Sequence, residues 1–158
     1  FKKNGKLTAG NSSKLSDGAA SLLLVNKDFL EKNNLKPKAI IKSFDISVKE
    51  PKYFPLTPLE SIIKLLKKNK LEMSDIDYFE INEAFSLLPI LLHKKFNIEY
   101  NKINIYGGAV SIGHPLGSSG CRIVGNLLNI LNNNNSKIGC ATICNGGGGA
   151  TSVLIEIL

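Results

Sequence analysis

Arginine is almost absent from this chain of 158 residues, although the chain is basic. Lysine supplies nearly all of the formal net charge of +7, and Arg122 is the single arginine. Arginine is the residue best suited to bidentate contacts with bases and phosphates, and the lysines are scattered along the sequence. We therefore interpret the charge as a solvated lysine surface. This predicts no nucleic-acid partner, but such a surface could attract a phosphate-bearing substrate.

Long apolar runs and a disulfide framework are also missing. No run approaches the roughly 20 apolar residues that cross a bilayer, and no secretory signal pattern is present, so we expect no membrane partner. The three cysteines, Cys121, Cys140 and Cys144, are odd in number and lack the spacing of a disulfide or zinc framework. They indicate a reducing compartment. Because the chain begins with Phe1, we expect it to be part of a longer protein.

The apolar content of 43% fits a globular chain with its own core. Strand-like and helix-like segments alternate and then finish as a hairpin, which predicts an α/β fold with a mixed sheet in one domain, residues 1–158. We expect strands at 18–25, 39–48, 78–81, 103–106, 138–144 and 151–157. We expect helices at 27–34, 57–70, 84–96 and 121–131, with N-caps from Thr57 and from Ser118 or Ser119.

A Gly-His-Pro turn is the first feature that suggests chemistry. His114 lies between Gly113 and Pro115, in a glycine-rich segment from 107 to 120. Glycine permits unusual backbone angles and proline fixes the next one, so the imidazole is poised to exchange a proton or to donate to an oxyanion. The alternative is a histidine in an ordinary turn, but the glycines leave room for a ligand and favour the functional interpretation. His93, beside two lysines, is interpreted as a surface residue.

Cys144 is the second such feature, because it ends an apolar strand just before a run of glycines, Gly146 to Gly149. A free thiol has a pKa near ~8.5, and a local positive field makes it a usable base or nucleophile. The glycine amides could point at a developing negative charge. The alternative is a small buried residue before a hairpin turn, although the glycine run is longer than a hairpin needs.

Two further segments could surround a ligand. Asn82 opens the sequence Asn-Glu-Ala-Phe at a predicted strand-to-helix junction, where α/β sheets bind ligands. It could position a water, polarise a carbonyl or cap the helix. The loop at 7–18, LTAGNSSKLSDG, could wrap a ligand or offer carbonyls to a cation, although an ordinary surface loop is the simpler interpretation.

Together these segments resemble the C-terminal half of the thiolase family. They read TAGNSSKLSDGAA from Thr8, NEAF from Asn82, GGAVSIGHPLGSSG from Gly107 and CNGGGG from Cys144. They stand in the family's order at nearly its spacing, across essentially the whole chain. Their context is most similar to the acetoacetyl-CoA thiolases, the acetyl-CoA C-acetyltransferases of the mitochondrial type. The resemblance implies half of a thiolase fold, with a mixed five-stranded sheet and helices on both faces.

The resemblance also implies a mechanism. Thiolases interconvert two acetyl-CoA with acetoacetyl-CoA plus CoA through an acyl-cysteine. By this likeness His114 would activate the nucleophilic cysteine, and Cys144 would exchange the α-proton of acetyl-CoA. Asn82 would hold a water that forms one oxyanion site with His114, and the backbone amide of Gly146 would serve the other.

Ligands follow from the same resemblance. CoA thioesters would be substrates, with no tightly bound cofactor, and Ser13 and Phe85 would lie along the coenzyme. Potassium-stimulated members bind K+ through loop carbonyls. Those positions match Ala9, Gly10, Ser12 and Val110 of this chain, although Gly10 and Ser12 replace alanines of the family.

The family's nucleophilic cysteine lies in its N-terminal half, and no cysteine here has its context. We therefore expect half a site that is inactive alone, with an exposed apolar face that promotes aggregation. The full-length protein is expected to be a homodimer or homotetramer in mitochondria or the cytoplasm. One alternative is a broad-range 3-ketoacyl-CoA thiolase of fatty-acid β-oxidation. Another, from a different class, is a non-catalytic basic RNA-binding or scaffold module, which would need the clustered arginines that the sequence lacks.

Overall fold

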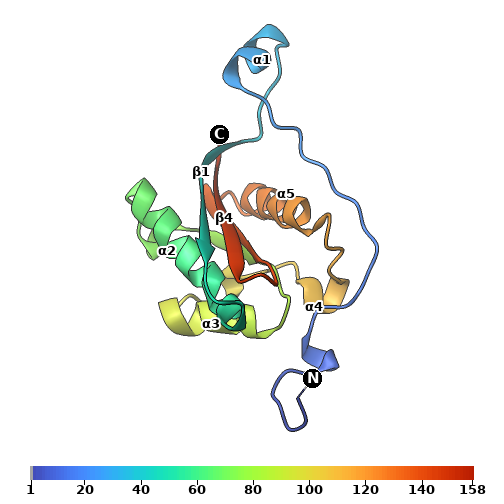
Figure 1. The fold of residues 1–158 in the computed structure, drawn as a ribbon. Helices are drawn as coiled ribbons and strands as arrows, with labels where there is room; N and C mark the ends of the chain where they lie inside the picture. The colour runs from blue at the N-terminus through green and yellow to red at the C-terminus, as the bar shows by residue number, and fades with distance from the viewer. Residues whose placement is uncertain (1) are drawn as a thin grey trace.

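A mixed four-stranded sheet forms the centre of the structure, a computed structural model that describes residues 2–158 (Figure 1). The strand order is β1-β4-β3-β2. β2 and β3 are parallel, whereas β4 is antiparallel to both β1 and β3. The strands are β1 (Ala39–Val48), β2 (Tyr78–Ile81), β3 (Ile138–Cys144) and β4 (Gly149–Ile157).

Helices cover both faces of this sheet, as predicted, with α2 on one side and α5 on the other (Figure 1). The helices are α1 (Lys27–Lys32), α2 (Thr57–Asn69), α3 (Leu87–Phe96), α4 (Ala109–Ile112) and α5 (Ser119–Asn133). Short 3-10 segments lie at Ala9–Asn11, Pro51–Leu56, Met73–Asp75 and Tyr100–Lys102. None of the helices between residues 2 and 158 is long and apolar enough to span a bilayer.

Two hydrophobic clusters, one on each face, hold the layers together. α2 and α3 bury leucines and isoleucines against β2, β3 and β4. α5 buries Ile123, Leu127 and Leu131 against Ala141 and Ile155. Successive side chains of β2 point to opposite faces of the sheet. Phe79 and Ile81 therefore join the cluster on the α2 and α3 side, whereas Glu80 lines a cavity on the α5 side.

The prediction of a five-stranded sheet was wrong. The sheet has four strands, because two of the six predicted strand segments are not strands. Residues 18–25 are extended but pair with no other strand of the described chain, and Leu23 and Leu24 are 82% and 67% exposed. Figure 1 shows this segment running outside the body toward α1. Apolar composition favours a strand, but a strand also needs a neighbour whose backbone can pair with it.

Residues 103–106, the other predicted strand, form a turn. Only Ile103 bridges to Phe79, and Asn104 has a left-handed φ of 48°. The side chain of Asn104 then takes the place of a strand at the edge of β2. Its Oδ1 accepts from the Ile81 N–H at 2.8 Å, and its Nδ2 donates to the Ile81 carbonyl at 2.8 Å.

Neither predicted helix cap makes a side-chain capping hydrogen bond, although Ser118 does stand at the N-cap position of α5. The Thr57 hydroxyl donates to the Gly148 carbonyl at 3.0 Å, so it ties the start of α2 to the glycine run. Ser118 precedes α5 without a capping hydrogen bond, and Ser119 is already helical. Two of the predicted helix starts also moved: α3 begins at Leu87 and α5 at Ser119.

An apolar stripe of β1 remains uncovered. Phe44, Ile46 and Val48 alternate along the strand and are all exposed. They lie on one face because successive side chains of a strand point to opposite sides. This agrees with the expected apolar face, whereas aggregation of the chain remains a prediction.

Replacing Asn104 should destabilise the protein in two separable ways. Asn104→Gly keeps the left-handed backbone but loses the side-chain bonds to Ile81, each worth about 0.5–1.5 kcal/mol. Asn104→Ala loses the same bonds and adds about 1–2 kcal/mol of left-handed strain. The melting temperature of the full-length protein should therefore fall for Gly and fall further for Ala. Equal melting temperatures for the three proteins would contradict this role.

Candidate active site

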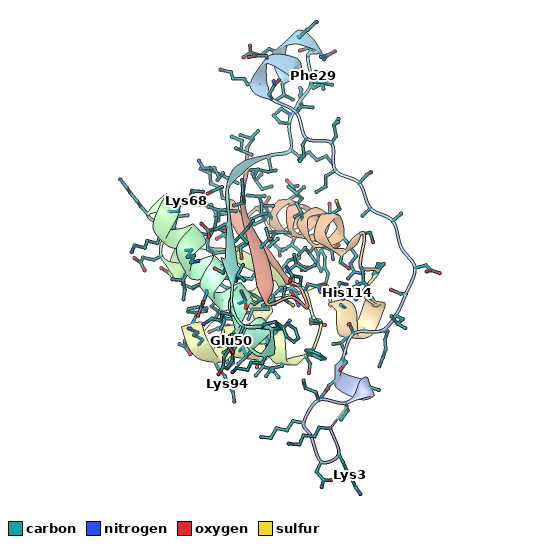
Figure 2. All side chains as sticks on the ribbon, in the orientation of Figure 1. Lys3, Phe29, Glu50, Lys68, Lys94 and His114 are labelled. Carbon is teal, nitrogen blue, oxygen red and sulfur yellow. The ribbon has the colours of Figure 1, made fainter. Side chains whose placement is uncertain are left out.

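The Gly-His-Pro turn is held by contacts that only glycine permits. Gly113 has a φ of 88°, and a Cβ there would lie 2.3 Å from the Ser16 hydroxyl. The backbone N–H of His114 donates to the Lys14 carbonyl at 2.9 Å. The N-terminal loop therefore packs directly on this turn, and Figure 2 shows His114 on the same side of the molecule as that loop.

Hydrogen bonds fix which nitrogen of His114 carries the proton. Nδ1 lies 2.6 Å from the Ser119 hydroxyl, which itself donates to the Pro115 carbonyl at 2.9 Å. Because that hydroxyl hydrogen is already used, Ser119 accepts from Nδ1–H. In the neutral ring Nε2 then has a lone pair, and it lies 3.2 Å from Nδ2 of Asn82, which donates to it. Nε2 is thus the basic atom of the pair.

Burial keeps this imidazole neutral. It lowers the pKa of His114 below the ordinary value of 6.5, and the positive charge of Arg122 lowers it further. Arg122 also donates from Nη1 to the Gly113 carbonyl at 2.9 Å. The single arginine of the chain therefore supports the histidine turn from inside.

Asn82 is a buried site residue and does not cap a helix. It follows β2 directly, and its N–H continues the parallel ladder by donating to the Thr142 carbonyl at 2.9 Å. α3 begins only at Leu87, which is too far along the chain for Asn82 to cap it. Its side chain reaches His114 instead.

Cys144 ends β3, the neighbouring parallel strand, so it lies at the same edge of the sheet as Asn82. Burial raises the pKa of its thiol, against a smaller lowering by a backbone hydrogen bond. Its side chain packs against the α2/α3 cluster. Within residues 2–158 no hydrogen bond joins its sulfur to His114 or Asn82.

The glycine run leaves one backbone amide available. The Asn145 side chain accepts from the N–H groups of Gly147 and Gly149, at 3.0 and 3.2 Å. Gly146, which lies between Asn145 and Gly147, is exposed, and its N–H donates to no acceptor of the described chain. Gly148 has a φ of 92°, and a side chain there would clash with the Lys49 carbonyl. The turn therefore requires glycine at this position.

Glu83 connects two of the motifs, a role that sequence reasoning missed. Its carboxylate accepts from Asn104 Nδ2 at 3.0 Å and from the Val110 N–H at 3.1 Å. A Cβ on Gly108 would lie 2.3 Å from that carboxylate. The glycine before α4, Gly108, thus makes room for Glu83. In the sequence, only the position of Glu83 directly after Asn82 indicated that it could belong to the site.

The predicted coenzyme residues lie together. The Ser13 N–H donates to the Ala84 carbonyl at 3.0 Å, and Ser12 forms a bridge with Phe85. The Phe85 ring packs on Phe54, with centroids 5.8 Å apart. The N-terminal loop is therefore more than an ordinary surface loop, because it pairs with the segment that follows Asn82.

One of the residues implied for potassium already has a cation on its carbonyl. Lys14 Nζ donates to the Ala9 carbonyl at 2.5 Å, so an ammonium already lies on the first of the implied ligands, Ala9, Gly10, Ser12 and Val110. A potassium ion at the same carbonyl would be repelled by this ammonium, by about 1 kcal/mol at 4 Å in water.

His93 is half-buried, which corrects its interpretation as a surface residue. Its Nδ1 lies 2.8 Å from the Ile98 carbonyl, and its ring stacks on Tyr100 with centroids 4.2 Å apart. Its role is structural, at the end of α3.

Comparison with known proteins identifies the family. Residues 35–157 match the family model described as thiolase, C-terminal domain. This chain belongs to the thiolase family. It is 47% identical to an acetyl-CoA acetyltransferase of Saccharomyces cerevisiae over 98% of its own length and 39% of that protein.

Two solved thiolase-family structures share the fold closely. The Bacillus anthracis acetyl-CoA acetyltransferase gives a TM-score of 0.95 at 35% identity, over 100% of this chain and 40% of that one. Human mitochondrial 3-ketoacyl-CoA thiolase in complex with CoA gives a TM-score of 0.91 at 34% identity, over 100% of this chain and 40% of that one. The chain thus spans about two fifths of the thiolases it matches.

Glu80 is a buried carboxyl that the sequence reasoning also missed. Burial raises its pKa to about 8, Glu83 raises it too, and Arg122 and a hydrogen bond from Asn126 act in the opposite direction. The sequence did contain a signal for this burial, because Glu80 lies between Phe79 and Ile81 in a short predicted strand.

Replacing Glu80 by Gln should remove a pH-dependent loss of stability. The folded carboxyl stays protonated up to about pH 8, whereas the unfolded one ionises near 4.5. Between these values the folded state binds more protons, so stability falls as pH rises. The melting temperature of Glu80→Gln relative to wild type should therefore increase from pH 5 to pH 8. Glu99→Gln, at an exposed position, is the control, and a constant difference for both variants would contradict the shift.

Potassium should not stabilise this protein. If Lys14 takes the cation's place, the melting temperatures in KCl and in choline chloride at equal ionic strength should agree within about a degree, since only a bound ligand raises stability by mass action. Lys14→Ala tests whether removing the ammonium creates a potassium effect. A clear potassium-specific rise in the wild type would contradict the interpretation.

Proposed function

We propose that this chain supplies the proton-transfer half of an acetoacetyl-CoA thiolase site, which interconverts two acetyl-CoA with acetoacetyl-CoA and CoA. The observation that carries the proposal is the paired geometry of His114 and Asn82. A neutral imidazole, fixed by Ser119 with its Nε2 lone pair toward Asn82, is a general base at neutral pH.

In the first step the base activates a nucleophile. We assign the acyl-carrying cysteine to another part of the full-length protein. His114 Nε2 accepts the thiol proton of that cysteine, and the thiolate attacks the thioester carbonyl of acetyl-CoA. The CoA thiolate leaves with the thiol proton of Cys144, so an acetyl-cysteine, a Cys144 thiolate and a protonated His114 remain.

In the second step Cys144 handles the α-proton. Its thiolate removes a proton from the methyl carbon of a second acetyl-CoA, and the resulting enolate attacks the acetyl-cysteine. Acetoacetyl-CoA forms, and the released nucleophilic thiolate takes back its proton from His114. In cleavage Cys144 must instead donate this proton, and its raised pKa keeps the resting group in the thiol form that donates.

Two groups of donors serve the oxyanions that form on these thioesters. Asn82, through a bound water, and the Nε2–H of His114, once that ring has accepted a proton, would stabilise one. The exposed Gly146 amide, which has no acceptor in the described chain, would stabilise the other. Both lie at the carboxyl edge of the sheet, where α/β folds bind ligands.

Coenzyme A would lie along the N-terminal loop, past Ser13 and Phe85. The CoA complex of the human thiolase relative supports this class of ligand. For the complete protein we propose a homodimer or homotetramer. Both cytosolic and mitochondrial proteins occur among the relatives, and either compartment fits the reducing environment that the free cysteines require.

A broad-range 3-ketoacyl-CoA thiolase is the second candidate, because a protein of that name shares the fold at a TM-score of 0.91. The same proton transfers serve both reactions. The ratio of kcat/KM for acetoacetyl-CoA to that for longer 3-ketoacyl-CoA thioesters distinguishes them, and we expect acetoacetyl-CoA to be preferred.

The variant Cys144→Ser of the full-length protein tests the assignment. A serine hydroxyl is a much weaker base than a thiolate, so condensation should fall by roughly 10²–10⁴-fold. Exchange of labelled CoA into acetyl-CoA, which needs only acyl transfer, should remain measurable. Cys121→Ser, at the start of α5, should leave both reactions unchanged. Normal condensation by Cys144→Ser would show that the assignment is wrong.

A further inference from the structure

Three buried polar atoms surround one small cavity beneath the His114–Asn82 pair. Glu80 Oε1, Asn82 Oδ1 and Arg122 Nε have no hydrogen-bond partner in the described chain, and all three residues line the same cavity. Buried polar atoms in folded proteins are nearly always hydrogen-bonded, to protein or to ordered water. Three such atoms around one cavity point to a shared partner.

The size of the cavity decides what that partner is. About 10 Å³ is open to the centre of a water molecule, which is room for one water and for no larger ligand. Internal waters typically make two to four hydrogen bonds to groups of this kind.

The fold places these groups together independently of the cavity. Glu80 and Asn82 are two residues apart along β2 and its continuation, so both side chains face α5. Arg122 and Asn126 are four residues apart on α5 and share the helix face that meets them. The charged and titratable groups around Glu80 are Arg122 on α5, Glu83 after β2, and His114 beyond Asn82.

We propose that this cavity binds one internal water, and that Glu80, Arg122 and this water position the Asn82 amide against His114. With Glu80 in its protonated form, one water gives each of the three atoms a partner. Arg122 Nε–H and the Glu80 carboxylic acid donate to the water, and the water donates to Asn82 Oδ1.

This arrangement determines which way the amide faces. With Oδ1 held by the water, Nδ2 must point to His114 Nε2, as observed at 3.2 Å. The lone pair of Nε2 favours the same orientation, so the water reinforces it and gives the buried Oδ1 a partner. Glu80 is therefore a positioning residue, and its kinetic role rests on the proposed function. The water contacts Oδ1, so it is separate from a water held inside the active site.

A crystal structure of the full-length protein at about 1.5 Å tests the water directly. We expect one ordered water within hydrogen-bond distance of Glu80 Oε1, Arg122 Nε and Asn82 Oδ1. A cavity without water, or closed by a shifted side chain, would overturn the proposal. This result does not depend on whether the protein has thiolase activity.

Kinetics of three variants test the positioning role. Glu80→Leu should lower kcat for acetoacetyl-CoA cleavage by roughly 10- to 100-fold, as expected when a site group is misplaced, with KM changed less than about threefold. Glu80→Gln, which resembles the neutral acid, should recover most of this loss. It should also flatten any decline of kcat above pH 8 that ionisation of Glu80 causes. Tyr78→Phe, on the same strand and face, is the matched control.

The outcomes separate the two proposals. If the wild-type protein has no thiolase activity, the proposed function fails and the crystal structure still decides the water. If the protein is active but Glu80→Leu, folded by melting temperature, matches wild type in kcat, the positioning role is overturned. The same holds if Glu80→Gln fails to recover activity.

Discussion

The parallel register of β2 against β3 places the polar residues of this chain at one edge of the sheet. Ile81 lies opposite Thr142, and the next N–H, that of Asn82, continues the ladder to the Thr142 carbonyl. Asn82 therefore emerges beside the strand that ends at Cys144. The amphipathic helices α2 and α5 fix this sheet from both sides. If β2 were shifted by one residue in its pairing with β3, the Asn82 side chain would face α3 and could not reach His114.

Backbone turns then bring the histidine to that edge. Glu83, Asn104 and the glycines before α4 form one hydrogen-bonded unit, so the turn after β2 and the turn before α4 are positioned together. Arg122 anchors the carbonyl before His114, and Ser119 selects its tautomer. Most of these partners are polar groups satisfied inside the protein, which favours one arrangement over alternatives.

Much of this was predictable from the sequence, for identifiable reasons. Strong periodicity located α2, α5 and the final hairpin, and the glycines around His114 and Cys144 indicated close backbone approach. The segment at 18–25 was mispredicted because apolar composition cannot reveal whether a partner strand is present. Ser119, Glu80 and Glu83 were missed because their roles come from contacts across turns and between layers. The sequence showed Arg122 only as a single arginine, because its support of the histidine turn appears only in three dimensions.

The central claim is that His114 is a neutral base whose proton lies on Nδ1. ¹⁵N NMR of the imidazole in the full-length protein tests it most directly, with the signals assigned by comparison with His114→Asn. At pH 7 the neutral Nδ1–H tautomer should be observed, and the ring should gain a second proton only below the ordinary histidine pKa of 6.5. An imidazolium at pH 7, or a neutral ring protonated on Nε2, would contradict the claim.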